Sequence, residues 1–351
     1  MKKHLFIAGA RPQYVKLAAL QRAFEDFEWW HTGQHPDPAM SEGFWTPLGL
    51  KNPSKSFIYG AFGTLLDDLE IALKADPPAL VLVVGDTNSA LAGALAAHRL
   101  GIPVAHVEAG LRSFDLTMPE ERNRRLIDTA SDLWFCTEQA AVNHLLREGA
   151  APENVHLVGN VMIDTLILNA EFGIRNEEWL EQPYILATFH RPSNVDTEAG
   201  RAKLEVLLER AAAQATLIFI THPRNSALAP TLPWQDIPHS APPIPRALFR
   251  IPHSSYHEFL SLLLGASVVL TDSGGVQDEC AFLGKPCITF RANTERPVTV
   301  SCGSNVLCDD PFLAVGLLRK ALNGCWGDMS VPPLWDGGSA LRIVKVIESI
   351  K

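Results

Sequence analysis

The chain has 351 residues, of which 47% are hydrophobic and 20% charged, and its formal net charge is −9. This length is too great for one ordinary hydrophobic core and favours two domains, and the composition excludes a disordered chain. The acidic balance argues against a nucleic-acid partner, because nucleic-acid binders usually present a broadly basic face. A local cluster of Arg and Lys can still bind an anionic substrate.

Apolar runs and cysteines bear on where the protein works. The longest apolar runs, such as 80–84, have the length of a strand, so we expect no signal segment and no membrane partner. The six cysteines are scattered and none belongs to a CxxC pair. This usage favours reduced thiols in a cytoplasmic protein and argues against a metal site.

Short apolar runs alternate with amphipathic helices from the start of the chain. Strands are predicted at 5–8, 80–84, 104–107 and 133–136, each followed by a helix. The first helix is expected to carry Leu17, Leu20, Phe24 and Phe27 on one face. Thr137 is predicted to cap the helix after the fourth strand, and Gly149 to close it.

The same alternation restarts after a polar segment that ends near residue 183. Strands are predicted at 184–188, 217–221, 268–271 and 286–290, a proline-rich surface loop at 228–245, and an amphipathic helix at 340–350. Strands that alternate with helices at this spacing imply parallel sheets. The predicted fold class is therefore α/β with parallel sheets, in two domains that span 1–166 and 167–337.

Candidate site residues follow the strands of the first half, because parallel sheets bind ligands at the carboxyl ends of their strands. Arg11 and Lys16 follow the first strand, while Asp86 and Glu108 follow two later ones. Glu120 opens a helix, a position that also suits simple capping. Several carboxylates near cations are suited to general acid/base work.

The second half offers an anion site. A strand runs into Ser273-Gly274-Gly275 at the start of a helix, where backbone N–H groups and the helix dipole favour an anion. A plain tight turn fits these glycines equally well, but Arg291 and Arg296 nearby favour a phosphate.

Two further side chains of the second half have open interpretations. Glu279, in the helix after the glycines, is either a partner of ribose hydroxyls or a surface carboxylate. His190 follows a strand and is a phosphate ligand, an acid/base group or a core histidine. The first turn, residues 9–13, is neither GxGxxG nor a Walker A sequence, which argues against a tightly bound NAD and a P-loop nucleotidase.

Ordered motifs run along nearly the whole chain. They are Gly9-Ala10-Arg11-Pro12-Gln13 with Lys16, Thr32-Gly33-Gln34-His35, Gly85-Asp86-Thr87, His106-Val107-Glu108-Ala109-Gly110-Leu111-Arg112, Pro119-Glu120-Glu121 with Asn123-Arg124-Arg125, His190-Arg191, Thr271-Asp272-Ser273-Gly274-Gly275-Val276-Gln277-Asp278-Glu279 and Thr294-Glu295-Arg296-Pro297. In this order they resemble the non-hydrolysing UDP-N-acetylglucosamine 2-epimerase family.

The resemblance implies two Rossmann-like domains in a GT-B-type architecture, with the active site in the inter-domain cleft and helix 338–351 packed back on the first domain. It implies a cytoplasmic homodimer that serves cell-surface polysaccharide biosynthesis. It also implies interconversion of UDP-GlcNAc and UDP-ManNAc by elimination of UDP to a 2-acetamidoglucal and re-addition. No hydride moves in this scheme, so no cofactor is expected.

The resemblance also assigns roles. The implied acid/base residues are Asp86, Glu108 and Glu120, assisted by Arg124 and His190. The groups that bind UDP and its diphosphate are Arg11, Lys16, Ser273, Gly274, Gly275, Glu279, Arg291 and Arg296. An effector site for a second UDP-GlcNAc is in question; its candidates are Gln34, His35 and His222.

The sequence departs from the family pattern at Gln13 and Ser193, where Glu is common, and at Arg122, where a small or apolar residue is common. The first two motifs resemble a branch that includes epimerases of UDP-2,3-diacetamido-2,3-dideoxyglucuronate, which is the main alternative substrate. A GT-B glycosyltransferase is a more distant alternative, and the clustered carboxylates favour an epimerase over it. A hydrolytic relative and a catalytically silent sugar-nucleotide binder are further alternatives.

Overall fold

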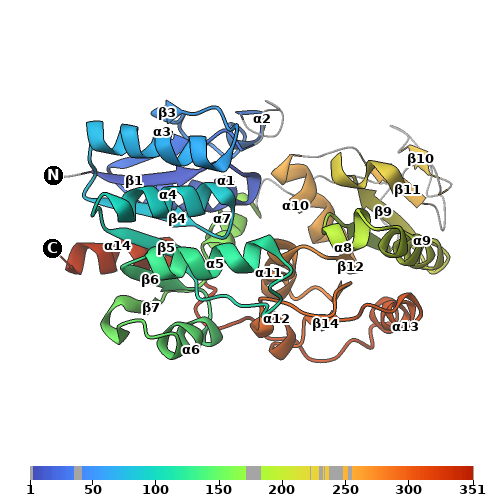
Figure 1. The fold of residues 1–351 in the computed structure, drawn as a ribbon. Helices are drawn as coiled ribbons and strands as arrows, with labels where there is room; N and C mark the ends of the chain where they lie inside the picture. Colours follow the sequence, from blue (N-terminus) through green and yellow to red (C-terminus); the bar gives the residue numbers. More distant parts are fainter. Residues whose placement is uncertain are drawn as a thin grey trace. The chain divides into compact units, whose positions relative to one another are not determined.

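A computed structural model describes residues 3–34, 42–170, 183–221, 223–228, 232, 234–236, 248–251 and 255–350. The chain forms two compact units. The first is Met1–Leu168 together with Pro333–Lys351, and the second is Asn169–Pro332. Each unit is built around its own parallel sheet (Figure 1).

The sheet of the first unit has seven parallel strands in the order β3-β2-β1-β4-β5-β6-β7. Their bounds are β1 His4–Ala8, β2 Phe27–His31, β3 Lys55–Ser56, β4 Leu80–Val84, β5 Val104–Ala109, β6 Leu133–Cys136 and β7 Val155–Leu157. The direction in which strands are added reverses between β1 and β4. At such a reversal the loops diverge and leave a crevice beyond the carboxyl ends of the strands.

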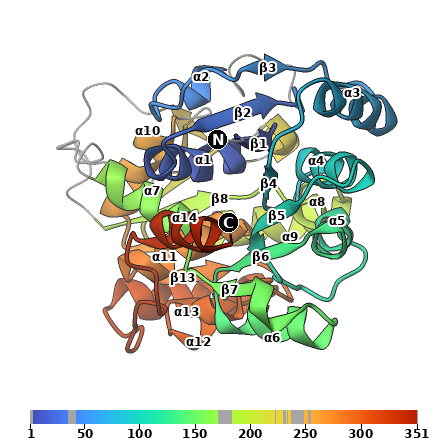
Figure 2. The same cartoon turned by 90° about the vertical axis from the view of Figure 1, so that its left-hand side faces the viewer.

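Helices cover both faces of this sheet, which is why its central strands are almost wholly apolar. Figure 2 shows α3, α4 and α5 on one face and α1 and α14 on the other. The helices are α1 Arg11–Ala23, α2 Glu42–Trp45, α3 Phe62–Ala75, α4 Asn88–Arg99, α5 Pro119–Ala130, α6 Gln139–Arg147, α7 Val161–Ala170 and α14 Ser339–Ser349, with a short 3-10 turn at Pro152–Asn154.

The last helix, α14, is fixed to the first unit at its N-terminus. The carboxylate of Asp164, on α7, accepts the backbone N–H groups of Ser339 at 3.2 Å and Ala340 at 2.7 Å. These are donors that a helix cannot satisfy within its own first turn. Just before the helix, the indole N–H of Trp335 donates to the carbonyl of Thr137 at 3.0 Å.

The second unit repeats the plan, with the strand order β10-β11-β9-β8-β12-β13-β14 and a reversal between β8 and β12. Its strands are β8 Tyr184–Thr188, β9 Thr216–Ile220, β10 Gln235–Asp236, β11 Leu248–Ile251, β12 Val268–Thr271, β13 Cys287–Thr289 and β14 Asn305–Leu307. Its helices are α8 Pro192–Val195, α9 Glu198–Ala212, α10 Tyr256–Gly265, α11 Gly274–Leu283, α12 Pro297–Ser301 and α13 Pro311–Leu322, with a 3-10 turn at Pro223–Leu228. The predicted fold class, α/β with parallel sheets, is confirmed.

Two local predictions for the first unit were wrong. Helix α1 ends at Ala23, so Phe27 does not lie on it; Phe27 instead opens β2, a strand that the pattern did not predict. Its ring packs 4.9 Å from that of Phe6 on β1, a contact that only sheet pairing creates. Helix α6 begins after Glu138, one residue later than the predicted cap Thr137.

Gly149, predicted to close that helix, does follow it, with φ +96°. The proline-rich segment 228–245 lies largely outside the described residues. Among the residues that are described, no helix is long and apolar enough to cross a membrane.

Candidate functional site

A buried ion pair lies at the carboxyl ends of the strands in the first unit. Lys16, on α1, contacts the carboxylate of Glu108 on β5, and the two residues are only 5% and 6% exposed. Gly85, after β4, lies against this pair: a Cβ added there would be 3.1 Å from Glu108 Oε2, and its φ is +68°. A glycine at this position therefore gives the pair room at the end of β4.

Glu108 has an unusual backbone. Its φ is +74°, and the pairing of β5 with β6 shifts register between Val107 and Ala109, on either side of it. A β-bulge of this kind redirects a side chain that the alternation of the strand would point elsewhere. A non-glycine residue in the left-handed region costs about 1–3 kcal/mol, so surrounding contacts must hold it there.

Asp86, the residue after Gly85, is held by α5. The Arg124 guanidinium contacts its carboxylate, and the Asn123 amide donates to its carbonyl at 2.9 Å. Glu120 lies half-buried in the first turn of the same helix. Strands β4 and β5 are direct neighbours. The structure thus places Asp86 and Glu108 at adjacent strand ends, each beside a cation from a helix.

Glu121, which the sequence analysis did not assign, holds this helix and the preceding loop together. Its fully buried carboxylate accepts the backbone N–H of Ser113 at 2.8 Å, that of Phe114 at 3.2 Å and the Arg124 guanidinium at 2.9 Å. Burial opposes its ionisation, but these donors outweigh burial and hold the pKa of Glu121 below its usual value. The Glu-x-x-Arg spacing puts both side chains on one helix face, and this feature of the sequence could have predicted the contact between Glu121 and Arg124.

Arg11 and Gln13 shape the entrance of α1. The Arg11 guanidinium stands 4.1 Å from the centre of the Phe44 ring, and burial lowers the pKa of Arg11 to about 10. The buried Gln13 amide accepts the N–H of Gly9 at 2.8 Å and donates to the carbonyl of Val84 at 2.9 Å. Gln13 therefore joins the ends of β1 and β4, a task that uses both the oxygen and the nitrogen of an amide.

In the second unit, Asp272 links the two strand ends that flank the reversal. It is fully buried after β12 and accepts the backbone N–H groups of His190 and Arg191, both at 2.9 Å, and the Asn194 amide at 2.9 Å. Its carboxylate also lies 3.5 Å from Nδ1 of His190. Asp272 thus positions the loop that carries His190. Its place directly after a predicted strand was the feature of the sequence that pointed to such a role.

The start of α11 contains the predicted glycine turn. Ser273 occupies the N-cap position, but among the described residues its side chain accepts no hydrogen bond from the first turn of the helix. A Cβ added to Gly274 would clash with the Arg296 guanidinium and lie 2.7 Å from Glu295 Oε1. Close packing of Arg296 and Glu295 against the turn is thus one reason for a glycine at position 274.

Three arginines of this unit, Arg191, Arg291 and Arg296, belong to a buried ionic cluster. Glu295 contacts Arg291 at 2.8 Å, Arg296 at 2.8 Å and Arg191 at 3.2 Å, and Arg296 also contacts Asp278 at 2.7 Å. The structure therefore places Arg291 and Arg296 on internal carboxylates. Contact of either with a phosphate stays a prediction.

Glu279 is not a surface carboxylate. It is 3% exposed and accepts the Tyr256 hydroxyl at 3.0 Å. Burial raises the pKa of Glu279 to about 8; the Tyr256 hydrogen bond opposes this rise only in part, and the charge of Asp278 adds to it. Burial of Glu279 thus favours its protonated form.

Of the residues considered for an effector site, only Gln34 is described. Its amide oxygen accepts the Ser89 hydroxyl at 2.7 Å. His35 and His222 lie outside the described residues.

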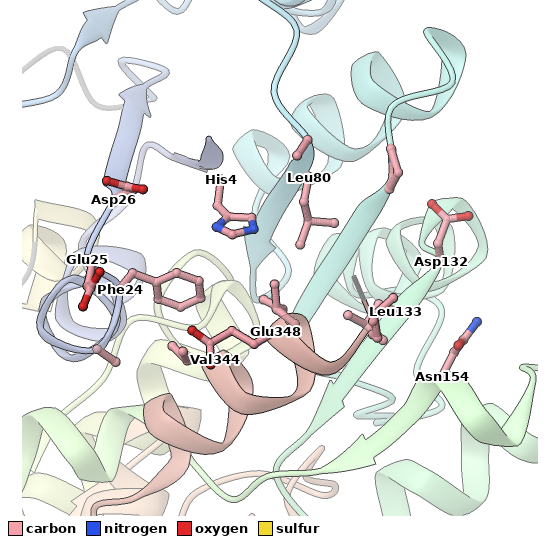
Figure 3. A pocket seen from close by; sticks show the side chains of 15 residues that line it. His4, Phe24, Glu25, Asp26, Leu80, Asp132, Leu133, Asn154, Val344 and Glu348 are labelled. Carbon is pink, nitrogen blue, oxygen red and sulfur yellow. The ribbon is translucent and has the colours of Figure 1, made fainter. Parts of the chain in front are cut away.

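A cavity of about 740 Å³ lies at the opposite edge of the first sheet (Figure 3). His4, Leu80 and Leu133, the first residues of β1, β4 and β6, line it together with Val344 and Glu348 of α14. None of the candidate site residues contributes to its lining. The candidate site therefore lies at the carboxyl edge and this cavity at the amino edge.

The fold, with charged side chains at the carboxyl ends of its strands, defines a class of enzyme built from two parallel-sheet α/β units. The family model for UDP-N-acetylglucosamine 2-epimerase matches residues 18–348, and the chain belongs to this family. Because 2-epimerases are isomerases, the protein is an isomerase by class.

Similar proteins cover almost the whole chain. A UDP-N-acetylglucosamine 2-epimerase of Methanococcus maripaludis is 35% identical over 99% of this chain and 98% of its own. A UDP-2,3-diacetamido-2,3-dideoxy-D-glucuronate 2-epimerase of Pseudomonas aeruginosa is 38% identical over 87% of this chain and 88% of its own. The crystal structure of Methanocaldococcus jannaschii UDP-GlcNAc 2-epimerase in complex with UDP-GlcNAc and UDP has a TM-score of 0.88 and 36% identity, and covers 99% of this chain and 100% of that one.

Proposed function

We propose that this protein interconverts UDP-GlcNAc and UDP-ManNAc. The observation that carries the proposal is the pair of carboxylates at adjacent strand ends, Glu108 beside Lys16 and Asp86 beside Arg124. The similarity to a structure described with UDP-GlcNAc and UDP supports a UDP-sugar as the ligand.

The proposed reaction begins with removal of the proton at C2 of the sugar. UDP leaves from C1 with the bonding electrons, and a C1=C2 double bond forms in a 2-acetamidoglucal. A proton then returns to the opposite face of C2, and UDP adds back to C1. Each face of C2 needs its own proton carrier, so at least two of Asp86, Glu108 and Glu120 share the work.

The remaining site residues are proposed to bind the nucleotide and the departing diphosphate. Stabilising the leaving group is necessary, because the C2 proton is only weakly acidic. Arg11, Lys16 and His190 supply cationic or hydrogen-bonding groups for the diphosphate, while Arg124 and His190 assist the acid/base residues. Ser273, Gly274, Gly275 and Glu279 are proposed to hold UDP, with Arg291 and Arg296 supporting that turn.

A second candidate substrate is UDP-2,3-diacetamido-2,3-dideoxyglucuronate, by the same mechanism. The 38% identity to the Pseudomonas aeruginosa enzyme named for this substrate supports it. It carries a carboxylate and a second acetamido group that UDP-GlcNAc lacks, so a direct comparison of the two substrates separates the candidates.

We further propose a homodimer in the cytoplasm. The family resemblance supports the dimer, and the six cysteines, all described and all free thiols, support a reducing compartment. Light scattering on the purified protein is expected to give twice the mass of one chain; the mass of a single chain would contradict the dimer.

The reaction is tested by incubating the protein with UDP-GlcNAc in deuterated water and following the products by NMR. We expect deuterium at C2 and formation of UDP-ManNAc. Exchange on the diacetamido-glucuronate alone would replace the first substrate by the second. A lack of exchange on both would overturn the proposed function.

A further inference from the structure

A buried histidine and aspartate lie behind the proposed acid/base residues. His106, on β5, is fully buried, two residues before Glu108. Its Nε2 lies 2.9 Å from the carbonyl of Gly85 and its Nδ1 2.6 Å from Oδ1 of Asp128, on α5. The ring therefore connects the end of β4, immediately before Asp86, with α5.

Asp128 reaches both sides of the bulge. Its Oδ1 contacts His106, before Glu108, and its Oδ2 accepts the backbone N–H of Gly110 at 3.2 Å, after Glu108. Oδ2 also contacts the Arg112 guanidinium at 2.7 Å. Residues two before and two after Glu108 are thus held by one carboxylate, and the residue between them has a φ of +74°. A strained backbone of this kind persists only where its surroundings fix it.

The hydrogen-bond partners of His106 show which of its ring nitrogens must donate. The Gly85 carbonyl can only accept, so Nε2 donates to it. Burial opposes the ionisation of Asp128, but His106 and Arg112 outweigh it and hold the pKa of Asp128 below its ordinary value. An ionised carboxylate accepts hydrogen bonds, and it lies 2.6 Å from Nδ1 of His106. The thiol of Cys136, on β6, also faces Asp128, and burial raises the pKa of Cys136, which keeps the thiol neutral.

We propose that Asp128 and His106 are positioning residues that hold Glu108 in its left-handed conformation and fix the Gly85 carbonyl beside Asp86. Neither residue needs to touch the substrate. This inference rests on the proposed function, since its consequence is the alignment of two acid/base groups with the sugar. Loss of such supporting contacts lowers activity because it misaligns the reacting groups; a displacement of about 1 Å can cost roughly 100-fold.

Two substitutions of Asp128 separate geometry from charge. Asp128→Ala removes its contacts with His106, Gly110 and Arg112. We expect kcat to fall roughly 100-fold while KM changes less than about threefold, because Ser273, Gly274, Gly275 and Glu279, proposed to hold UDP, lie in the other unit. In Asp128→Asn the amide oxygen can still accept from Gly110 and Arg112, and its NH₂ can donate to a neutral His106. We expect this variant to keep kcat within about fivefold of the parent.

Glu148→Gln is the matched control. Glu148 contacts Arg112 from the surface, at 2.6 Å, but touches neither side of the bulge, so kcat should stay at the parent value. Equal losses in Asp128→Ala and Asp128→Asn, or a folded Asp128→Ala with parental kcat, would overturn the proposal. If Asp128→Ala does not fold, His106→Gln replaces it: a tenfold or greater fall in kcat at constant KM supports the proposal, and parental kcat refutes it.

A measurement without substrate separates this inference from the proposed function. In protein labelled with ¹⁵N-histidine, the His106 signals, identified by their loss in His106→Gln, should show a hydrogen on Nε2, the nitrogen that lies 2.9 Å from the Gly85 carbonyl. An Nε2 without a hydrogen would contradict the inference even in an active epimerase. An Nε2 with its hydrogen, in a protein that exchanges no C2 proton on any UDP-sugar, would refute only the proposed function.

Discussion

The two units carry acids and cations at equivalent strand reversals but differ in how far the acids are exposed. In the first, Asp86 remains 31% exposed at its side chain, and Asp86 and Glu108 each contact a cation from a helix. In the second, Arg291 and Arg296 contact Glu295, whose side chain is 1% exposed. The first arrangement suits groups that exchange protons with a substrate, and the second suits a structural ion-pair network.

The difference shows that the kinds of charged residue at the strand ends do not by themselves reveal whether those residues act in catalysis or in structure. Both units combine acids with cations after parallel strands, as the sequence indicates. Only the first has a carboxylate on a strained bulge, whereas the second has a carboxylic acid, Glu279, whose pKa is raised to about 8 by burial. Three substitutions test this comparison, beginning with the largest expected effect.

Glu108→Gln should lower kcat about 1000-fold or more while UDP still binds, because it removes a proton carrier and leaves unchanged the groups of the second unit that are proposed to hold UDP. NMR of the epimerisation and calorimetry with UDP measure the two effects. Glu28→Gln is the matched control, since Glu28 contacts Lys3 at 2.9 Å near the amino edge of the same sheet. Near-parental turnover in Glu108→Gln would remove the acid/base role and the contrast between the units.

Glu295→Gln should mainly affect stability. It leaves three buried or nearly buried guanidinium groups with one carboxylate charge fewer, and breaking such a network costs about 3–5 kcal/mol in the free energy of unfolding. Denaturant unfolding measures the loss, with Glu209→Gln on the exposed face of α9 as control. Unchanged stability together with a large loss of UDP affinity would instead make the cluster a direct ligand site.

Glu279→Gln should change the pH dependence. The folded pKa of Glu279, about 8, lies above its ordinary value of 4.5, so its contribution to stability is complete below pH 4.5 and is lost as the pH rises to about 8. The substitution should remove that slope, whereas Glu258→Gln, at the exposed start of α10, should not.

The same titration should appear in nucleotide binding. If Glu279 accepts hydrogen bonds from ribose hydroxyls, binding favours its ionised form, and UDP affinity should rise roughly fivefold between pH 7.5 and 9.5. The terminal phosphate titrates near pH 6 and is fully charged over this range. An affinity that is flat in the parent, or that rises equally in Glu279→Gln, would contradict the proposed ribose contact.

Several features followed from the sequence alone. The alternation of apolar runs and amphipathic helices predicted two α/β halves with parallel sheets, because local periodicity reports which faces are buried. Arg11, Asp86, Glu108 and His190 were identified because they follow strands, and the strand ends are where parallel sheets bind ligands. Ordered motifs identified the family, which the family model and the relatives confirm.

Only the tertiary structure decided how these residues are held. Strand β2 was missed and α1 was extended to Phe27, because pairing with β1 overrides the local pattern there. Several features depend on groups far apart in the chain. They are the bulge at Glu108, the contacts of Asp128 on both sides of it, the buried partners of Arg291 and Arg296, and the raised pKa of Glu279. Burial and ion pairing are properties of such distant neighbours, whereas the periodicity that sets helices and strands is local.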